Sequence, residues 1–196
     1  IPGVGRFAVV ADPQGAAFML FRGSSDEAPP NAAPGTPGHV GWHELHAGDG
    51  PAAFAFYSGL FGWTADQAMD MGEMGVYQLF AAGGTAIGGM MTKTSDVPAP
   101  NWLYYFNVDA VEPAMERVKQ GGGQVLNGPM EVPGPMWIAQ CIDPQGAMFA
   151  IVGGDLVHRL GVAVAEADRG GHRAGARADP HRQVEPAVGA AQLLTQ

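Results

Sequence analysis

The chain has 196 residues, of which 46% are hydrophobic, so it can bury the core of one domain or of a domain and a fraction. Its formal net charge of −9 argues against nucleic acid or an anionic membrane as a partner, because both need a basic face. A single cysteine, Cys141, excludes an internal disulfide, and no apolar run is long enough to span a bilayer. We therefore expect a cytoplasmic protein whose partner is a small molecule.

The chain opens with a segment that it repeats later. Residues 2–23 read PGVGRFAVVADPQGAAFMLFRG, and residues 133–154 read PGPMWIAQCIDPQGAMFAIVGG. In both copies two apolar strands flank an Asp-Pro-Gln-Gly turn, in which proline and glycine supply the required dihedral angles. Each copy is predicted to be a β-hairpin. We interpret residues 1–23 as the closing hairpin of a preceding domain that is otherwise missing, and the second copy as the end of a complete domain.

The first half of that complete domain follows a linker. Residues 24–38 are polar and rich in proline, which is typical of a connection between domains. A strand is expected over residues 39–47, and then a helix that Asp49 caps, Pro51 opens and Gly62 ends. Three strands divided by glycine turns follow, at residues 63–71, 76–81 and 85–91. Residues 39–92 therefore form a predicted βαβββ module.

The same order of elements recurs after residue 100. A strand over residues 102–108 precedes a helix over residues 111–120, which we expect Asp109 to cap, and three more strands follow. This second module covers residues 101–153, so the domain spans residues 39–154. Residues 155–196 contain five arginines, no lysine and no aromatic residue, and we predict a low-complexity, disordered tail.

Three features together resemble the vicinal oxygen chelate superfamily, which includes glyoxalase I, bleomycin-resistance proteins and extradiol dioxygenases. They are the tandem modules, the helix end FYSGLFGW at residues 56–63, and the Asp-Pro-Gln-Gly-Ala hairpin. The chain looks like the second domain of two-domain bacterial glyoxalase-like proteins that are often labelled hydroxylases. The resemblance implies an α+β fold in which two βαβββ modules form a cup-shaped mixed sheet around one small-molecule site. Here an orphan β-hairpin precedes that fold.

The resemblance also implies four metal-ligand positions, on the first and fourth strands of each module. They fall at about Trp42, Gly88, Leu103 and Ala150. None of these residues supplies the imidazole, carboxylate or thiolate that zinc, nickel, iron or manganese requires. We therefore expect neither a metal nor another cofactor.

The strand at residues 39–47 carries the best candidates for chemistry. Side chains alternate along a strand, so Trp42, Glu44 and His46 share one face, which the resemblance places inside the cup. Glu44 is expected to have a raised pKa among apolar neighbours and to act as an acid or base, with His46 assisting. The alternative is a carboxylate paired to a neighbouring donor for structure alone. A register shifted by one residue would bring in His43 and Tyr104 as ligands, but it would expose the core face of each strand.

In the second module, alternate residues of the strand at residues 102–108 are expected to face the inside of the cup as well. Tyr105 and Asn107 can orient a ligand through hydrogen bonds, Tyr105 can assist Glu44, and Trp42 can stack on a flat ring. The alternative reading is that these aromatic side chains only pack in a core. The predicted ligand-binding residues are Trp42, Glu44, Leu103, Tyr105, Asn107 and Ala150.

Three functions are consistent with these residues. The first is a metal-free domain of the glyoxalase/bleomycin resistance type that captures a small aromatic or amphipathic molecule. The second is a lyase, isomerase or hydroxylase of the same fold, with Glu44 as acid or base and Tyr105 or His46 assisting, with or without a divalent metal. The third is a decayed structural partner. Both a homodimer and pairing with the missing first domain stay open as assemblies.

Overall fold

The structure is a computed structural model that describes residues 1–25 and 32–154. Only part of the predicted linker at residues 24–38 is therefore described, and the tail at residues 155–196 lies outside the described residues. The chain forms two compact units, and the boundary between them falls after Tyr105.

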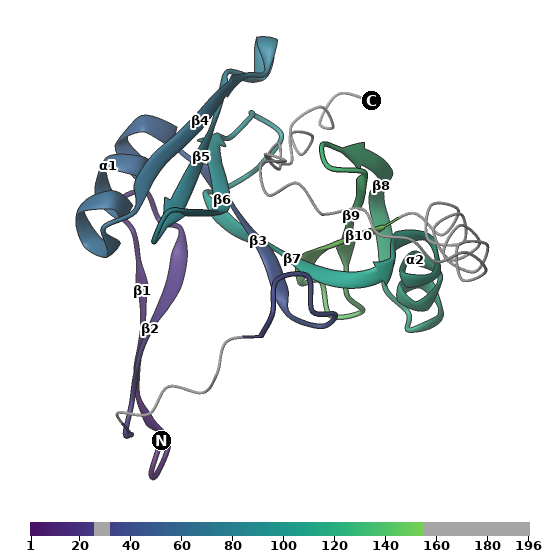
Figure 1. The fold of residues 1–196 in the computed structure, drawn as a ribbon, viewed down its shortest axis with the longest axis horizontal. Helices are drawn as coiled ribbons and strands as arrows, with labels where there is room; N and C mark the ends of the chain where they lie inside the picture. The colour runs from purple at the N-terminus through teal and green to yellow at the C-terminus, as the bar shows by residue number, and fades with distance from the viewer. Residues whose placement is uncertain (26–31, 155–196) are drawn as a thin grey trace, which may run out of the picture. The chain divides into compact units, whose positions relative to one another are not determined.

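The first unit contains a hairpin and a βαβββ module. Its elements in chain order are β1 (Gly5–Ala11), β2 (Ala17–Gly23), β3 (Val40–Ala47), α1 (Gly50–Phe61), β4 (Thr64–Asp70), the 3-10 turn η1 (Gly72–Met74), β5 (Val76–Ala82), β6 (Thr85–Thr92) and the first half of β7 (Asn101–Ala110). The hydrogen-bonded order is β4-β5-β6-β3-β7 (Figure 1). Strands β3 and β6 are parallel, whereas β4, β5 and β6 are antiparallel in succession. The predicted mixed sheet is confirmed.

The second unit repeats this order from the second half of β7. It continues with α2 (Val111–Gln120), β8 (Gln124–Val132), β9 (Met136–Ile142) and β10 (Met148–Gly154). The strand order is β7-β10-β9-β8. Helix α2 buries Val111 and Ala114 in a cluster with Ala139, Cys141 and Ile151 from β9 and β10. The βαβββ order predicted for each module is therefore confirmed.

The ends of the two helices follow different rules. Helix α1 begins as predicted, because the Asp49 carboxylate accepts a hydrogen bond from the Ala52 N–H at 2.9 Å. It ends at Gly62, whose φ of 69° is the left-handed conformation that glycine favours. The predicted cap of α2 is wrong. Strand β7 continues through Ala110, so Asp109 still lies in the strand and the cap position falls on Ala110, which makes no side-chain cap bond.

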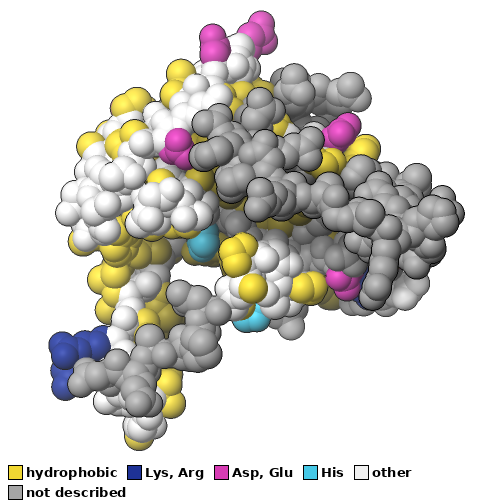
Figure 2. All heavy atoms as spheres, in the orientation of Figure 1, with side chains coloured by type: hydrophobic (Ala, Val, Ile, Leu, Met, Phe, Trp, Pro, Cys, Tyr) yellow, Lys and Arg dark blue, Asp and Glu magenta, His cyan; other side chains and the backbone are white. Residues whose placement is uncertain are grey.

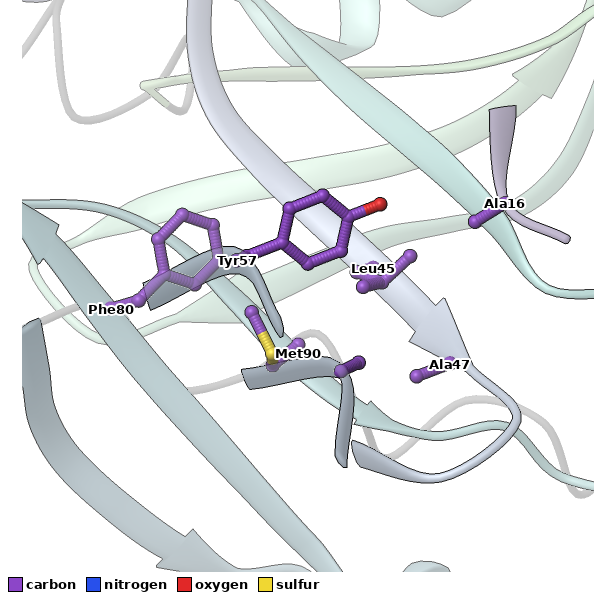
Figure 3. Close-up of a cluster of buried hydrophobic side chains, with 7 residues drawn as sticks. Ala16, Leu45, Ala47, Tyr57, Phe80 and Met90 are labelled. Carbon is purple, nitrogen blue, oxygen red and sulfur yellow. The ribbon is translucent and has the colours of Figure 1, made fainter. Parts of the chain in front are cut away.

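The core of the first unit lies between α1 and one face of its sheet. Leu45, Tyr57, Phe80 and Met90 are almost completely buried there (Figure 3), and Trp63 stacks on Phe80 with ring centroids 4.4 Å apart. Ala16, from the hairpin, is 0% exposed within the same cluster. The hairpin is thus part of this core, which it reaches with its turn and with Phe18 at the start of β2.

The turn of the first hairpin binds α1 directly. Tyr57 donates its hydroxyl to Asp12 Oδ2 at 3.1 Å. The amide of Gln14 pairs with the backbone of Asp49, donating to the Asp49 carbonyl at 3.0 Å and accepting from its N–H at 2.7 Å. The rest of the hairpin extends away from α1 (Figure 1).

Away from the turn, one face of the hairpin is apolar and exposed. The register of β1 and β2 places Phe7 opposite Phe21 and Val9 opposite Met19, and each of these side chains is at least 50% exposed. Hydrophobic side chains are visible along this hairpin in Figure 2. Such a face is unusual for a protein surface and is typical of a surface that meets another one.

Candidate functional site

Strand β3 carries Glu44 at the centre of a buried hydrogen-bonded cluster. Glu44 is 1% exposed, and three groups reach its carboxylate. His46 Nε2 lies 2.8 Å from Oε1, the Tyr105 hydroxyl donates to Oε1 at 3.1 Å, and the Tyr77 hydroxyl donates to Oε2 at 3.0 Å. A buried carboxylate is tolerated only when its oxygens are satisfied in this way. The strand alternation thus brings Glu44 and His46 to one face, and β7 adds Tyr105 to them.

Trp42 joins the same cluster through a residue that the sequence analysis missed. Its Nε1–H donates to the Tyr77 hydroxyl at 2.9 Å, so Tyr77 connects Trp42 to Glu44. Tyr77 lies on β5, and its ring covers Gly89 of β6, where any Cβ would overlap the ring. The signal in the sequence was the Gly88-Gly89 pair inside a strand, since glycine there often marks the close approach of another group.

The ladder between β3 and β6 corrects one expected position. Glu44 pairs with Gly89 and His43 pairs with Gly88, and partners in a ladder present the same face. Gly89 therefore lies on the Glu44 face, whereas Gly88 lies on the opposite face, where a Cβ would overlap Phe80. The expectation that Gly88 occupies the ligand position beside Trp42 is wrong by one residue.

The residues of the first unit do not fit the metal centre that the family resemblance implies. Trp42, Leu103 and Gly89 offer no ligand atom of the required kind, and Tyr77 fills the space above Gly89. Within residues 1–25 and 32–154, no three His, Cys, Asp or Glu side chains are grouped as a metal site would need. The acid and the imidazole on this face, Glu44 and His46, are bonded to each other.

Two of the predicted ligand-binding residues belong to the second unit. Asn107 lies on β7 and is 7% exposed, and Ala150 lies on β10 and is 0% exposed. Both are buried residues of that unit, and their role in binding stays a prediction. Leu103 is equally buried in the first unit, at 1% exposed.

Comparison with known proteins gives the family. Residues 36–151 match the model of the Glyoxalase/Bleomycin resistance protein/Dioxygenase superfamily. The chain belongs to this superfamily. The observed order of two βαβββ modules agrees with the resemblance inferred from the sequence.

Individual relatives extend this finding. The chain is 35% identical over 129 residues to the anthracycline biosynthesis protein DnrV of Streptomyces peucetius, a match that covers 59% of this chain and 46% of DnrV. It is 30% identical over 96 residues to a glyoxylase-like domain-containing protein of Didymella fabae, covering 46% of this chain and 73% of that protein. Among solved structures, methylmalonyl-CoA epimerase from Mycobacterium tuberculosis is similar with a TM-score of 0.45 and 14% identity, over 64% of this chain and 95% of that one. The chain thus spans about half the length of DnrV.

Burial raises the pKa of the Cys141 thiol, which disfavours the reactive thiolate, so Cys141 is an inert core residue of the second unit. None of the helices in the described part of the chain has the length and apolar composition of a transmembrane segment.

The tyrosine that holds Glu44 stays protonated over a wide pH range. Burial raises the pKa of Tyr77 well above its ordinary value, and the negative charge of Glu44 raises it further. Tyr77 can therefore act as a hydrogen-bond donor to Glu44 at any physiological pH.

We expect this raised pKa to make the protein less stable in alkali. The unfolded state releases the Tyr77 proton near pH 10 and the folded state does not, so the stabilisation is complete below about pH 10 and falls as the pH rises above it. The free energy of unfolding should drop by about 1.4 kcal/mol per pH unit for this one group. Urea denaturation at several pH values measures the slope, and Tyr77→Phe should reduce it. An equal alkaline slope in Tyr77→Phe would show that other groups cause the loss.

Proposed function

We propose that this domain binds a small organic molecule on the Glu44 face of its first unit, without using a metal. The observation that carries the proposal is the Glu44 cluster itself. On the face where the superfamily's enzymes hold a metal, this chain has a carboxylate bonded to one imidazole and two phenol groups. The cluster fixes polar side chains beside the half-buried ring of Trp42, and a few fixed polar groups next to aromatic side chains are typical of a small-molecule site.

The class of ligand is proposed to be flat and aromatic. Trp42 is half-buried on the Glu44 face and is held by its bond to Tyr77, so its ring is fixed without being part of the core. An indole ring in this position can stack on an aromatic ligand. The similarity to DnrV, which is named for anthracycline biosynthesis, supports a polycyclic aromatic ligand.

This proposal is tested by titration calorimetry with an anthracycline, and with bleomycin as a second probe. Trp42→Phe should weaken anthracycline binding by roughly threefold to tenfold, because the smaller ring stacks less well and loses its bond to Tyr77. Trp63→Phe is the matched control, since Trp63 packs on the α1 face against Phe80. Equal affinities for the wild type and Trp42→Phe would contradict a binding site at Trp42, and absence of heat with both probes would contradict the ligand class.

A second function, catalysis, is favoured by the contact between His46 and Glu44. A buried imidazole 2.8 Å from a carboxylate is the arrangement by which proteins orient a general base. In this hypothesis His46, which at 7% exposed is less buried than Glu44 and Tyr105, exchanges the proton with the substrate, while Glu44 and the Tyr105 hydroxyl bonded to it hold the imidazole in place. The proposed reaction class is a lyase or isomerase step that moves one proton.

Glu44→Gln distinguishes the two functions. The amide keeps the size and part of the hydrogen bonding of the carboxylate but cannot take up a proton. An enzyme should lose turnover by about a hundredfold or more while its substrate affinity changes little. A binding protein has no turnover to lose and should show only a change in affinity. Turnover of methylglyoxal with a thiol, followed by absorbance, is the first assay because a relative is named for glyoxylase-like chemistry.

A further inference from the structure

We propose that the turn of the second hairpin, residues 143–147, is a docking site for the first helix of another domain of the same superfamily. The proposal comes from the contact that the other copy of this turn, residues 12–16, already makes with α1. Within residues 1–25 and 32–154, one example of this recognition element contacts a helix and the other is exposed.

The occupied example defines what the turn recognises. Tyr57 on α1 donates to Asp12, and the backbone of Asp49, at the N-cap of α1, pairs twice with the Gln14 amide. Ala16 is 0% exposed in the core beside α1. Phe18 then meets Tyr57 edge-on, with ring centroids 5.5 Å apart. Recognition therefore uses the carboxylate, the amide, a small buried side chain and an aromatic ring.

The second copy has the same side chains in the same conformation. Asp12 Oδ1 accepts from the N–H groups of Gln14 and Ala16, and Asp143 Oδ1 accepts likewise from those of residues 145 and 147. The ladders also share their register. Ala11 pairs with Ala17 as Ile142 pairs with Met148, and Val10 pairs with Phe18 as Cys141 pairs with Phe149. The second turn is therefore already in the shape that binds a helix.

The two copies differ in what covers them. Asp12 and Ala16 are buried, whereas Asp143 is only half-buried and both Gln145 and Ala147 are exposed. The same residue types are thus covered in one copy and open in the other. The exposed turn keeps the aspartate, glutamine and alanine that its buried copy uses, whereas the aromatic ring of Phe149 already packs against the core of the second unit. Residues 143–147 are therefore the part of this copy that is open to a partner.

The partner must bring its own helix of the α1 type. Such a helix has an N-cap aspartate and, eight residues later, a tyrosine, as Asp49 and Tyr57 show. Helix α2 does not qualify, because its N-cap is Ala110 and no tyrosine occurs along it. Among the described helices α1 alone fits, and its site is filled by residues 12–16.

A second domain of the superfamily is the partner that fits best. DnrV, of which this chain covers 46%, has room for such a domain. The hairpin at residues 2–23 has the sequence and register of a closing hairpin, so a domain of this kind is what it would complete. Two such domains would then exchange turns, each placing its closing hairpin on the first helix of the other, as in interfaces where both partners use the same surface.

One substitution made in each copy tests the proposal on the full chain. Ala16→Asp puts a charge into the buried contact and should expel the first turn, which leaves α1 open while all of its own residues stay in place. A second molecule can then dock its 143–147 turn on that helix. We expect Ala16→Asp to associate reversibly in sedimentation velocity, and Ala16→Asp with Ala147→Asp to associate at least about tenfold more weakly. Ala147→Asp alone should leave the stability unchanged, because Ala147 is exposed.

A second pair of variants covers the case in which Ala16→Asp does not fold. Asp12→Ala with Gln14→Ala removes the bonds to Tyr57 and Asp49 without adding a charge, and Asp143→Ala with Gln145→Ala removes their counterparts. Asp66→Ala with Gln67→Ala, on the exposed part of β4, is the control for loss of the same groups elsewhere. The proposal is overturned if association is equally strong when the second turn is altered. Hydrogen exchange at the Asp49 amide shows whether the first turn has left α1, because this N–H is bonded to Gln14 in the wild type. The proposal is also overturned if this amide has lost its protection and the variants still stay monomeric.

Discussion

Glu44→Leu is expected to lower the free energy of unfolding by about 3 to 5 kcal/mol. Leucine fills a similar volume but accepts no hydrogen bond, so the hydroxyls of Tyr77 and Tyr105 and the imidazole of His46 would lose their acceptor together. These groups lie in a region where Glu44 itself is 1% exposed, so water cannot replace the carboxylate without opening the structure. Urea denaturation followed by circular dichroism measures the change.

Two control variants separate this effect from the loss of any carboxylate. Glu44→Gln retains one accepting oxygen and should cost only about 1 to 2 kcal/mol. Glu73→Leu removes an exposed carboxylate and should change the stability by less than about 0.5 kcal/mol. A cost for Glu44→Leu below that of Glu44→Gln would mean that the carboxylate does not hold the three donors in solution.

Gly89→Ala is expected to cost about 2 to 3 kcal/mol and to move Tyr77 away from Glu44. A methyl group at residue 89 would overlap the Tyr77 ring, and that ring is fixed at its far end by bonds to Trp42 and Glu44. The ring must therefore shift, and the hydrogen-bond network must break or follow it. Near-ultraviolet circular dichroism and urea denaturation report the two effects separately.

Gly59→Ala is the matched control, with an expected effect of opposite sign. Gly59 lies within α1, and no atom lies within 4 Å of the position that its Cβ would take. Alanine there should stabilise the protein by about 0.5 to 1 kcal/mol, because glycine is a poor helix former. If Gly89→Ala left the free energy of unfolding unchanged, or raised it as Gly59→Ala is expected to do, the ring of Tyr77 could not lie over β6.

Local patterns predicted most of the fold. The Asp-Pro-Gln-Gly turns specify both hairpins, because each turn residue has a conformational role that does not depend on distant contacts. Asp49 and Gly62 likewise mark the ends of α1 through their own backbone and side-chain geometry. Alternation along β3 was enough to place Glu44 and His46 on one face.

What the sequence did not reveal depends on register between strands. Tyr77 is 33 residues from Glu44 along the chain, and only the pairing of β5, β6 and β3 brings the two together. The same pairing decides that Gly89 rather than Gly88 lies on the Glu44 face. Asp109 failed as a cap because β7 runs two residues further than its apolar pattern indicates. A one-residue change in register or length cannot be read from composition and spacing.

We propose that Glu44 is held by protein donors on a face that does not bind a metal. Titration calorimetry with Zn²⁺ and Ni²⁺, performed on the wild type and on Glu44→Gln, tests it most directly. We predict identical heats for the two proteins, since any metal bound by histidines elsewhere in the chain does not depend on Glu44. Binding of one equivalent of metal to the wild type that disappears in Glu44→Gln would contradict the account.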